Sequence, residues 1–354
     1  MIQPVKIGNF LIGKGKPCFI IAEAGVNHNG DIKLAHELIN AAVKAGADAI
    51  KFQSFVSEEI VSVKAKKANY QIETTGDVGG QFAMLKKLEL SWEQQAELKA
   101  HCDKANICYL CTPYEEKSAD FLEGIGVAAY KIASTDISNI PFLRYMARKN
   151  NPVILSTGMS TLGEVEDSVN ELKLNGLVGK IIIMQCTAEY PAPVKDINLR
   201  AMKTMEFAFD CPVGFSDHTA GIGAGPWAVA ASACAIEKHF TLDRNMFGPD
   251  HRASIEPEEL TELVKTIRNV EAALGDGIKR PMPCEIANKS KMQKSLVATR
   301  TISSGEVIRS DDLTSKRPRN GLEPKWFDRV VGKKVAKQIQ KGETLQLDSI
   351  IWSE

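Results

Sequence analysis

The feature that most constrains the fold is a short apolar run followed by a capped helical segment, which recurs eight times between residues 18 and 275. Pairs such as Ser91 with Gln94 and Thr161 with Glu164 match the capping box that begins helices. This size and rhythm predict a (β/α)8 TIM barrel, with a doubly wound open sheet as the alternative. The predicted strands are 18–24, 47–52, 107–111, 127–133, 153–156, 180–185, 212–215 and 233–238.

The composition changes after Gly275. Residues 278–293 are polar and contain proline, and we expect a linker there between a catalytic barrel of residues 1–277 and a small β-rich domain of residues 294–354. From Lys289 onward, 14 Lys and Arg stand against 8 Asp and Glu, whereas the whole chain is balanced at 44 each. A basic small domain suits docking on an acidic surface, although a solvated face would show the same excess.

The balanced charge of the whole chain predicts no nucleic-acid partner and no membrane partner. Its apolar runs are shorter than the roughly 20 residues of a spanning helix, and its first residues do not follow the pattern of a secretory signal. Eight cysteines are scattered along the chain, as is typical of reduced thiols. We therefore expect a cytoplasmic protein.

Two histidines, His218 and His239, each follow a predicted strand at the point where it gives way to a loop. Imidazole is a common ligand of divalent transition metals, and two histidines with further positions left open suit a catalytic metal. The alternative is that one of them caps a helix and the other is a hydrogen-bonded core residue.

Donor side chains gather at the ends of other predicted strands, namely Lys51, Thr112, Lys131, Ser134 and Ser156. The carboxyl ends of barrel strands meet at one mouth, so a barrel would collect these groups in a single site. Ammonium groups and hydroxyls together suit a phosphate or a carboxylate. Each residue alone could instead form a structural ion pair or a cap.

Three carboxylates, Glu23, Asp136 and Asp250, fall in the same ring and are candidates for general acid or base catalysis beside the metal. Together these residues predict a barrel enzyme that holds a phosphorylated anion and activates a second substrate on a divalent metal. The segment from Phe55 to Leu90 breaks the strand and helix rhythm, and we expect a surface excursion beside the mouth. The charge run from Lys64 to Lys67 is interpreted as a solvated face.

Several motifs together resemble the sialic acid synthase family, which includes close relatives such as legionaminic acid synthase. They include IAEAGVNHNG at 21–30, KFQ at 51–53, YKI at 130–132, LSTGM at 155–159, FSDHT at 215–219, EKHFT at 237–241 and GPDH at 248–251. Residues 294–298 and 316–321 are similar to that family's antifreeze-like (SAF) domain. The resemblance covers nearly the whole chain.

The resemblance implies a metal-dependent, aldol-type condensation of phosphoenolpyruvate with N-acetylmannosamine, giving N-acetylneuraminate and phosphate. The alternative is the same reaction on 2,4-diacetamido-2,4,6-trideoxymannose, giving N,N'-diacetyllegionaminate. It implies that His218 and His239 hold Mn²⁺ or Mg²⁺, and that Glu23 manages protons. It assigns phosphoenolpyruvate to Lys51, Gln53, Thr112, Lys131, Ser134 and Ser156, and the sugar to Tyr190, Ser216 and Asp250.

The resemblance also implies a domain-swapped homodimer, in which Arg317 of one subunit reaches the sugar's acetamido group in the other. The chain departs from the commoner pattern at Asp136, where Glu is frequent, and at Arg319, where Gly or Ala is common. Both positions lie near the expected sugar end of the site. Two other classes remain as alternatives, namely a different metal-dependent barrel aldolase or hydrolase and a non-catalytic ice- or polysaccharide-binding protein.

Overall fold

The computed structural model describes residues 2–67, 69–76 and 80–352. The chain divides into two compact units, Met1–Gly275 and Asp276–Glu354, and each is described by itself. No helix in these described ranges is long and apolar enough to cross a membrane.

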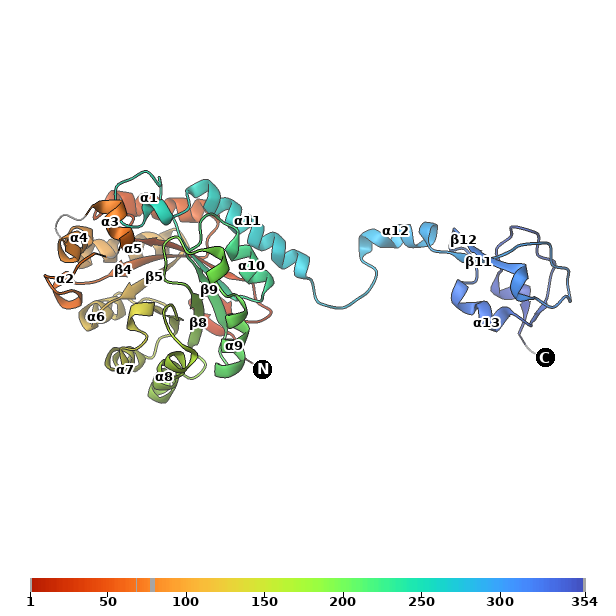
Figure 1. Cartoon of the computed structure of the whole chain (residues 1–354), viewed down its shortest axis with the longest axis horizontal. Helices are drawn as coiled ribbons and strands as arrows, with labels where there is room; N and C mark the ends of the chain where they lie inside the picture. Colours follow the sequence, from red (N-terminus) through yellow and green to blue (C-terminus); the bar gives the residue numbers. More distant parts are fainter. Residues whose placement is uncertain (1, 68, 77–79, 353–354) are drawn as a thin grey trace. The chain divides into compact units, whose positions relative to one another are not determined.

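The first unit is built on a closed barrel of eight parallel strands, so the predicted TIM barrel is confirmed and the open sheet is excluded (Figure 1). The last strand pairs with the first, and this pairing places His239 beside Glu23. The strands are β3 (Phe19–Gly25), β4 (Ala49–Ser54), β5 (Cys108–Pro113), β6 (Tyr130–Ile132), β7 (Val153–Ser156), β8 (Ile181–Cys186), β9 (Val213–Asp217) and β10 (Ala235–His239).

Helices surround the barrel and begin at the caps that the sequence indicates. Asp31 caps α1, Gly46 ends it in the left-handed conformation, and both predicted capping boxes are present at Ser91 and Thr161. The main helices are α1 (Ile32–Ala45), α5 (Trp92–Lys104), α6 (Glu116–Gly124), α7 (Ile140–Arg148), α8 (Leu162–Leu172), α9 (Arg200–Phe209), α10 (Ala224–Ala230) and α11 (Pro257–Leu274).

Alternation along the strands divides the core into two layers. On β8, Ile181 and Ile183 belong to the large cluster under the helices, whereas Ile182 and Met184 belong to the cluster inside the barrel. The same alternation decides which polar side chains reach the barrel mouth, because successive residues point to opposite faces of a strand.

A hairpin that the sequence analysis did not predict, formed by β1 (Val5–Ile7) and β2 (Phe10–Ile12), precedes the barrel. Its buried side chains join the interior cluster with residues at the starts of the barrel strands, such as Phe19 and Ala49. The hairpin therefore covers the amino-terminal end of the barrel. Strands of three residues are too short for alternation to predict them.

The segment between β4 and α5 contains three short helices, α2 (Ser57–Ile60), α3 (Asn69–Thr75) and α4 (Gly80–Leu88). Val26, Phe55, Met84 and Leu88 form a separate hydrophobic cluster beneath it. The interpretation of Lys64–Lys67 as a solvated run is wrong for Lys67. That side chain is buried, and its Nζ donates hydrogen bonds to Thr75 Oγ1 (3.0 Å) and the Gly76 carbonyl (2.7 Å).

The second unit has a hydrophobic cluster of its own, which includes Leu296, Ile302, Val335 and Leu345. Its strands are β11 (Ser295–Ala298) paired with β12 (Leu313–Lys316), and β13 (Lys334–Val335) paired with β14 (Ile350–Ile351), with α13 (Phe327–Val330) between the pairs. Part of the segment predicted as a linker, 278–293, forms an exposed helix, α12 (Pro283–Met292).

Candidate active site

A cavity of about 700 Å³ lies at the carboxyl ends of the barrel strands. Every candidate residue of the first unit lines it, so the strand-end pattern brings them together as expected for a barrel mouth. These residues are Glu23, Lys51, Gln53, Thr112, Lys131, Ser134, Asp136, Ser156, Tyr190, Ser216, His218, His239 and Asp250.

Gly25 shapes the end of the first barrel strand. Its φ is +52°, a conformation that favours glycine, and the pairing of β3 with β4 shifts register between Glu23 and Gly25. A Cβ at this position would lie 3.2 Å from Glu23 Oε1 and 3.3 Å from Gln53 Nε2. Glycine therefore allows these two side chains to meet, and Gln53 Nε2 donates a 3.3 Å hydrogen bond to Glu23.

Lys51 is the centre of one half of the polar network. Its buried Nζ lies 2.8 Å from Glu23 Oε2 and 3.9 Å from Glu237 Oε2, and it donates a hydrogen bond to Thr112 Oγ1 at 3.1 Å. Burial alone would lower the pKa of this ammonium, but the two carboxylates outweigh burial and raise it. Lys51 is therefore held charged.

Lys131 is the centre of the other half. Its Nζ donates a 2.7 Å hydrogen bond to Ser156 Oγ and lies 3.5 Å from Glu237 Oε1. Burial lowers the pKa of Lys131, and the Glu237 carboxylate opposes this effect. Glu237 thus stands between the two lysines and also accepts a 3.1 Å hydrogen bond from Ser216 Oγ.

The pKa values of the two buried glutamates are shifted in opposite directions. Burial raises the pKa of Glu23, with Lys51 opposing it, so this carboxyl can hold a proton near neutral pH. For Glu237 burial acts in the same direction, but Lys131 and Lys51 together outweigh it and lower the pKa. Such a pair suits a division of roles, in which Glu23 exchanges protons and Glu237 stays ionised.

His218 is oriented by the backbone. Its Nδ1 lies 2.7 Å from the Thr187 carbonyl, so this nitrogen donates and Nε2 is the one left to face a cation. Burial lowers the pKa of His218, but Cys186 and the Thr187 carbonyl outweigh burial and raise it, so a cation would have to displace a proton from Nε2. Nε2 lies 3.3 Å from Ser216 Oγ. A ligand imidazole is commonly fixed in this way by a carbonyl on its other nitrogen. The Tyr190 ring packs on His218 at a centroid distance of 4.2 Å.

His239 lies across from His218, with ring centroids 5.6 Å apart. Burial lowers the pKa of His239 well below its usual value and keeps the ring neutral, the form that binds metals. Its buried Nδ1 has no hydrogen-bond partner among the described residues. The two imidazoles therefore fit a divalent cation that takes its remaining ligands from substrate or water.

His218 and His239 do not belong to a larger set of protein ligands that would surround a metal ion completely. In the described part of the chain, no group of three or more His, Cys, Asp and Glu side chains is arranged to hold a metal ion. Two protein ligands with open positions are typical of a cation that binds together with substrate, rather than of a structural site.

Asp250 and Asp136 are half-buried carboxylates that also line the cavity. Burial raises the pKa of Asp250 to about 6, with His218 and Lys51 opposing it. Burial also raises the pKa of Asp136, although its oxygens accept hydrogen bonds from Asn139 Nδ2 (3.2 Å) and Thr135 Oγ1 (3.3 Å).

The loop that carries Asp250 is held by residues whose role the sequence analysis did not identify. His251 contacts Thr241 Oγ1 (2.7 Å) through Nδ1 and Asn29 Oδ1 (3.1 Å) through Nε2. Asn29 Nδ2 donates to the Phe247 carbonyl at 2.9 Å. Asn27 Nδ2 likewise donates to the Phe240 carbonyl at 2.9 Å, so both asparagines of the 21–30 motif attach the last loop of the barrel to the segment that follows β3. In the sequence, these asparagines were noticeable only as members of the 21–30 motif.

Glu237 and Cys186 are further cavity residues that were not among the predicted site residues. Glu237 was visible only as part of the Glu237–His239 strand end. Arg317 lies in the second unit, directly after β12, and is exposed. By contrast, the neighbouring Arg319 is held within that unit by Glu323 at 2.8 Å.

The cavity therefore has two chemically different ends. Lys51 and Lys131 with three hydroxyls can bind an anion by charge-assisted hydrogen bonds. The paired imidazoles of His218 and His239 can hold a cation that polarises a carbonyl oxygen. A carboxyl able to hold a proton, Glu23, lies between the two ends, at 2.8 Å from Lys51 and beside His239 in the strand register.

Comparison with known proteins yields matches over nearly the whole chain. The NeuB family model matches residues 38–279, and the SAF domain model matches residues 293–351. The N,N'-diacetyllegionaminic acid synthase of Campylobacter jejuni is 47% identical over 332 residues, covering 94% of this chain and 99% of that protein. The enzyme of that name from Legionella pneumophila is 42% identical, covering 96% of each.

A solved structure shows the same similarity in three dimensions. The N-acetylneuraminic acid synthetase of Leptospira borgpetersenii, crystallised with citrate, superposes with a TM-score of 0.73 at 37% identity. The match covers 81% of this chain and 95% of that chain.

Proposed function

The chain belongs to the NeuB family, and we propose that it is an enzyme that condenses phosphoenolpyruvate with an N-acetylated amino-sugar aldehyde. The products would be a nine-carbon 2-keto sugar acid and inorganic phosphate. One observation carries the proposal: a clamp of two buried lysines and a pair of facing histidines line the same cavity, with Glu237 in contact range of both lysines.

Phosphoenolpyruvate would occupy the lysine end. Lys51 and Lys131 would supply charge to its phosphate and carboxylate, and Thr112, Ser134 and Ser156 would supply directed hydrogen bonds. The two ammonium groups are already oriented by Thr112 and Ser156. The clamp is therefore preorganised, which lowers the cost of ordering it on binding.

The sugar aldehyde would lie at the histidine end. A divalent cation such as Mn²⁺ or Mg²⁺, held by His218 and His239, supplies Lewis acidity to the aldehyde oxygen when it is bound. Carbon 3 of phosphoenolpyruvate forms the new bond to the aldehyde carbon, water adds to carbon 2, and the carbon–oxygen bond to phosphate breaks. Glu23, whose pKa is raised by burial, would donate a proton to the aldehyde oxygen or accept one from the water.

Tyr190, Ser216 and Asp250 would contact the sugar, because all three line the cavity beside the histidines. Asp136 would lie toward the sugar end of the rim. N-acetylmannosamine is one candidate acceptor, because the Leptospira protein is named for the corresponding product. A diacetamido acceptor is the second candidate, because the Campylobacter and Legionella relatives are named for N,N'-diacetyllegionaminic acid.

We further propose that the working unit is a homodimer in which the SAF domain of each chain completes the site of the other. Arg317 is exposed at the end of β12, and its planar guanidinium suits an acetamido oxygen. An exchange of this kind closes under two-fold symmetry.

The test is phosphate release from phosphoenolpyruvate, with each acceptor and with no acceptor, in the presence and absence of a chelator. We expect release only when acceptor and divalent cation are both present. Release that ignores the acceptor would indicate a phosphatase, and turnover of the sugar without phosphoenolpyruvate would indicate a different aldolase. Absence of turnover with either acceptor, under conditions where the protein is folded, would contradict the proposal.

A further inference from the structure

The loop that joins β8 to α9, residues 187–199, surrounds His218 on one side. The Thr187 carbonyl accepts a 2.7 Å hydrogen bond from His218 Nδ1, and the Tyr190 ring packs on the imidazole. The Ala192 backbone N–H donates to the His218 carbonyl at 2.8 Å. This one loop therefore holds both the ring and the backbone of a residue that is a proposed cation ligand.

The direction of the Thr187 carbonyl is fixed by two donors. Besides His218 Nδ1, it accepts a hydrogen bond from the Glu189 backbone N–H at 2.9 Å. A carbonyl oxygen has two lone pairs, so both are used here. The orientation of the His218 ring therefore depends on where the start of the loop lies.

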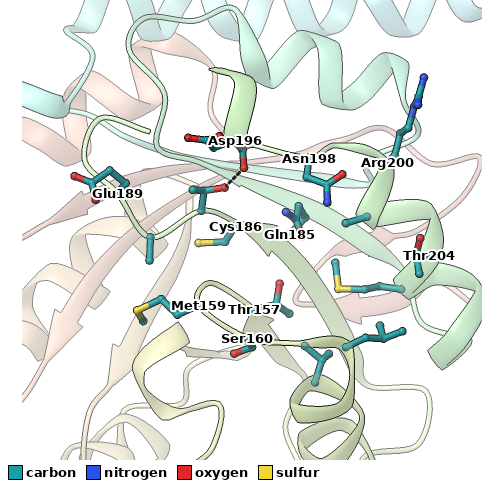
Figure 2. Close-up of a pocket in the computed structure, with 16 residues that line it drawn as sticks. Thr157, Met159, Ser160, Gln185, Cys186, Glu189, Asp196, Asn198, Arg200 and Thr204 are labelled. Atoms are coloured by element: carbon teal, nitrogen blue, oxygen red, sulfur yellow. Dashed lines mark hydrogen bonds between the residues drawn. The ribbon is translucent and has the colours of Figure 1, made fainter. Parts of the chain in front are cut away.

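Two side chains attach the start of this loop to its end. Thr187 Oγ1 donates to the Asp196 carbonyl at 3.1 Å, the dashed line in Figure 2. Gln185 Nε2, from the last turn of the strand before the loop, donates to the Ile197 carbonyl at 3.1 Å. We call these two hydrogen bonds the tethers, because they close the loop at its base just before α9 begins.

A second cavity of about 700 Å³ lies beside the tethers, between the end of β8, the loop after β7 and the start of α9 (Figure 2). Gln185, Thr187 and Asp196 line this second cavity and do not line the reaction cavity. Open space on this side leaves fewer packing contacts to hold the base of the loop, so the tethers matter more for its position. Because the three residues lie outside the reaction cavity, their effect on the reaction must pass through His218.

We propose that Gln185 and Thr187 are positioning residues, whose tethers hold the loop so that His218 presents Nε2 to the cation. This inference rests on the proposed function and deepens its metal site. Residues that orient a metal ligand without touching the metal commonly set the affinity of the site. The tethers should therefore affect the affinity for Mn²⁺ and leave the anion clamp unchanged, since Lys51 and Lys131 lie on β4 and β6.

Two substitutions remove the tethers one at a time. Thr187→Val removes the hydroxyl and keeps the branched shape, and Gln185→Met removes the amide and keeps the length. Each should weaken Mn²⁺ binding, measured by isothermal titration calorimetry, by about 3- to 10-fold, the effect of one lost hydrogen bond. The kcat should fall at limiting Mn²⁺ and recover when Mn²⁺ is raised, while the KM for phosphoenolpyruvate stays within about twofold.

Two further variants serve as controls. Thr187→Ser keeps the hydroxyl and should bind Mn²⁺ as the wild type does. Thr204→Val removes a hydroxyl from an exposed residue of α9 that lines the same second cavity, and it should leave the affinity for Mn²⁺ unchanged. Gln185→Met decides the test alone if Thr187→Val does not fold.

Equal affinity for Mn²⁺ in the wild type, Thr187→Val and Gln185→Met would overturn this inference, even if both variants lose stability. An equal loss of affinity in Thr204→Val, or in Thr187→Ser, would also overturn it, and so would a wild-type protein that binds no Mn²⁺. Failure of the condensation shows differently, as a wild-type protein that binds Mn²⁺ but releases no phosphate with either acceptor. The calorimetric comparison of the variants decides the role of the tethers in that case too.

Discussion

Replacing Lys131 by Met removes one of the two ammonium groups from the anion clamp while keeping side-chain length. The Lys131 side chain is 4% exposed, and its Nζ contacts Ser156 Oγ at 2.7 Å. A hydrogen bond from a buried charge to an anion is worth about 1.5 to 3 kcal/mol. We therefore expect the KM for phosphoenolpyruvate to rise by about 10- to 150-fold, with a much smaller change for the sugar.

The same substitution also has a structural cost, which must be measured separately. It leaves Glu237 without one of its two lysines, and removing one partner of a buried ion pair costs about 3 to 5 kcal/mol. We expect the lower end of this range, because Glu237 keeps Ser216 at 3.1 Å and Lys51 at 3.9 Å. Urea unfolding of the variant measures this loss directly.

Lys238→Met provides the matched control. Lys238 is 1% exposed and lies 3.2 Å from Asp217 Oδ2, but it does not line the cavity. It should lose a similar amount of stability and keep its KM for phosphoenolpyruvate, as measured by initial rates of phosphate release. A KM for phosphoenolpyruvate that is unchanged in Lys131→Met, or that rises equally in both variants, would refute the assignment of Lys131 to the anion.

Three further predictions concern the metal, the assembly and the pH dependence of stability. His218→Ala should lower kcat by orders of magnitude and remove Mn²⁺ binding measured by calorimetry, because a catalytic metal supplies several kcal/mol; retained turnover in the presence of chelator would argue against the metal. Mixing His218→Ala with Arg317→Ala should restore part of the activity if the SAF domains cross over, whereas a mixture that stays inactive indicates that each chain serves its own site. Burial and the nearby His251 lower the pKa of His28 from 6.5 to about 4, so the unfolded chain binds the proton more readily. The contribution of His28 to the free energy of unfolding is complete above pH 6.5 and falls by about 3 kcal/mol as the pH falls to about 4. In His28→Asn, the free energy of unfolding measured by urea titration should therefore decrease less over this pH range.

Local signals predicted most of the barrel because they act within a few residues. The Thr161 capping box begins α8 where the sequence indicates it, and β7 has the predicted bounds of 153–156. Strand ends shift elsewhere: the predicted strand 127–133 is shortened to β6 (Tyr130–Ile132), because β7 pairs with it over only three residues and β5 at only one. Pairing partners, unlike caps, are set by residues far away in the chain.

For the candidate site too, local signals were predictable and contacts between distant residues were not. The rule that strand-end residues share one mouth collected Lys51, Lys131 and His218 correctly in one cavity. Glu237 was given no role because its position at a strand end does not show which side chains it meets, and only the fold shows that it faces Lys51 and Lys131. Lys67 was misplaced for a similar reason, since its burial depends on Thr75 and Gly76 folding over it.

The barrel closes where its last strand, β10, pairs with its first, β3, and this seam has a consequence for synthesis of the protein on the ribosome. Glu23 and His239 are neighbours across this seam, yet 215 residues separate them in the chain. At translation rates of about 5–20 residues per second, the first strand waits on the order of 10 to 40 s for its partner. Throughout that interval the nascent chain has an open sheet edge and no complete active site. Ribosome-bound chains that end before β10 should therefore depend on chaperones and release no phosphate, and competence should arise late, within the last third of translation.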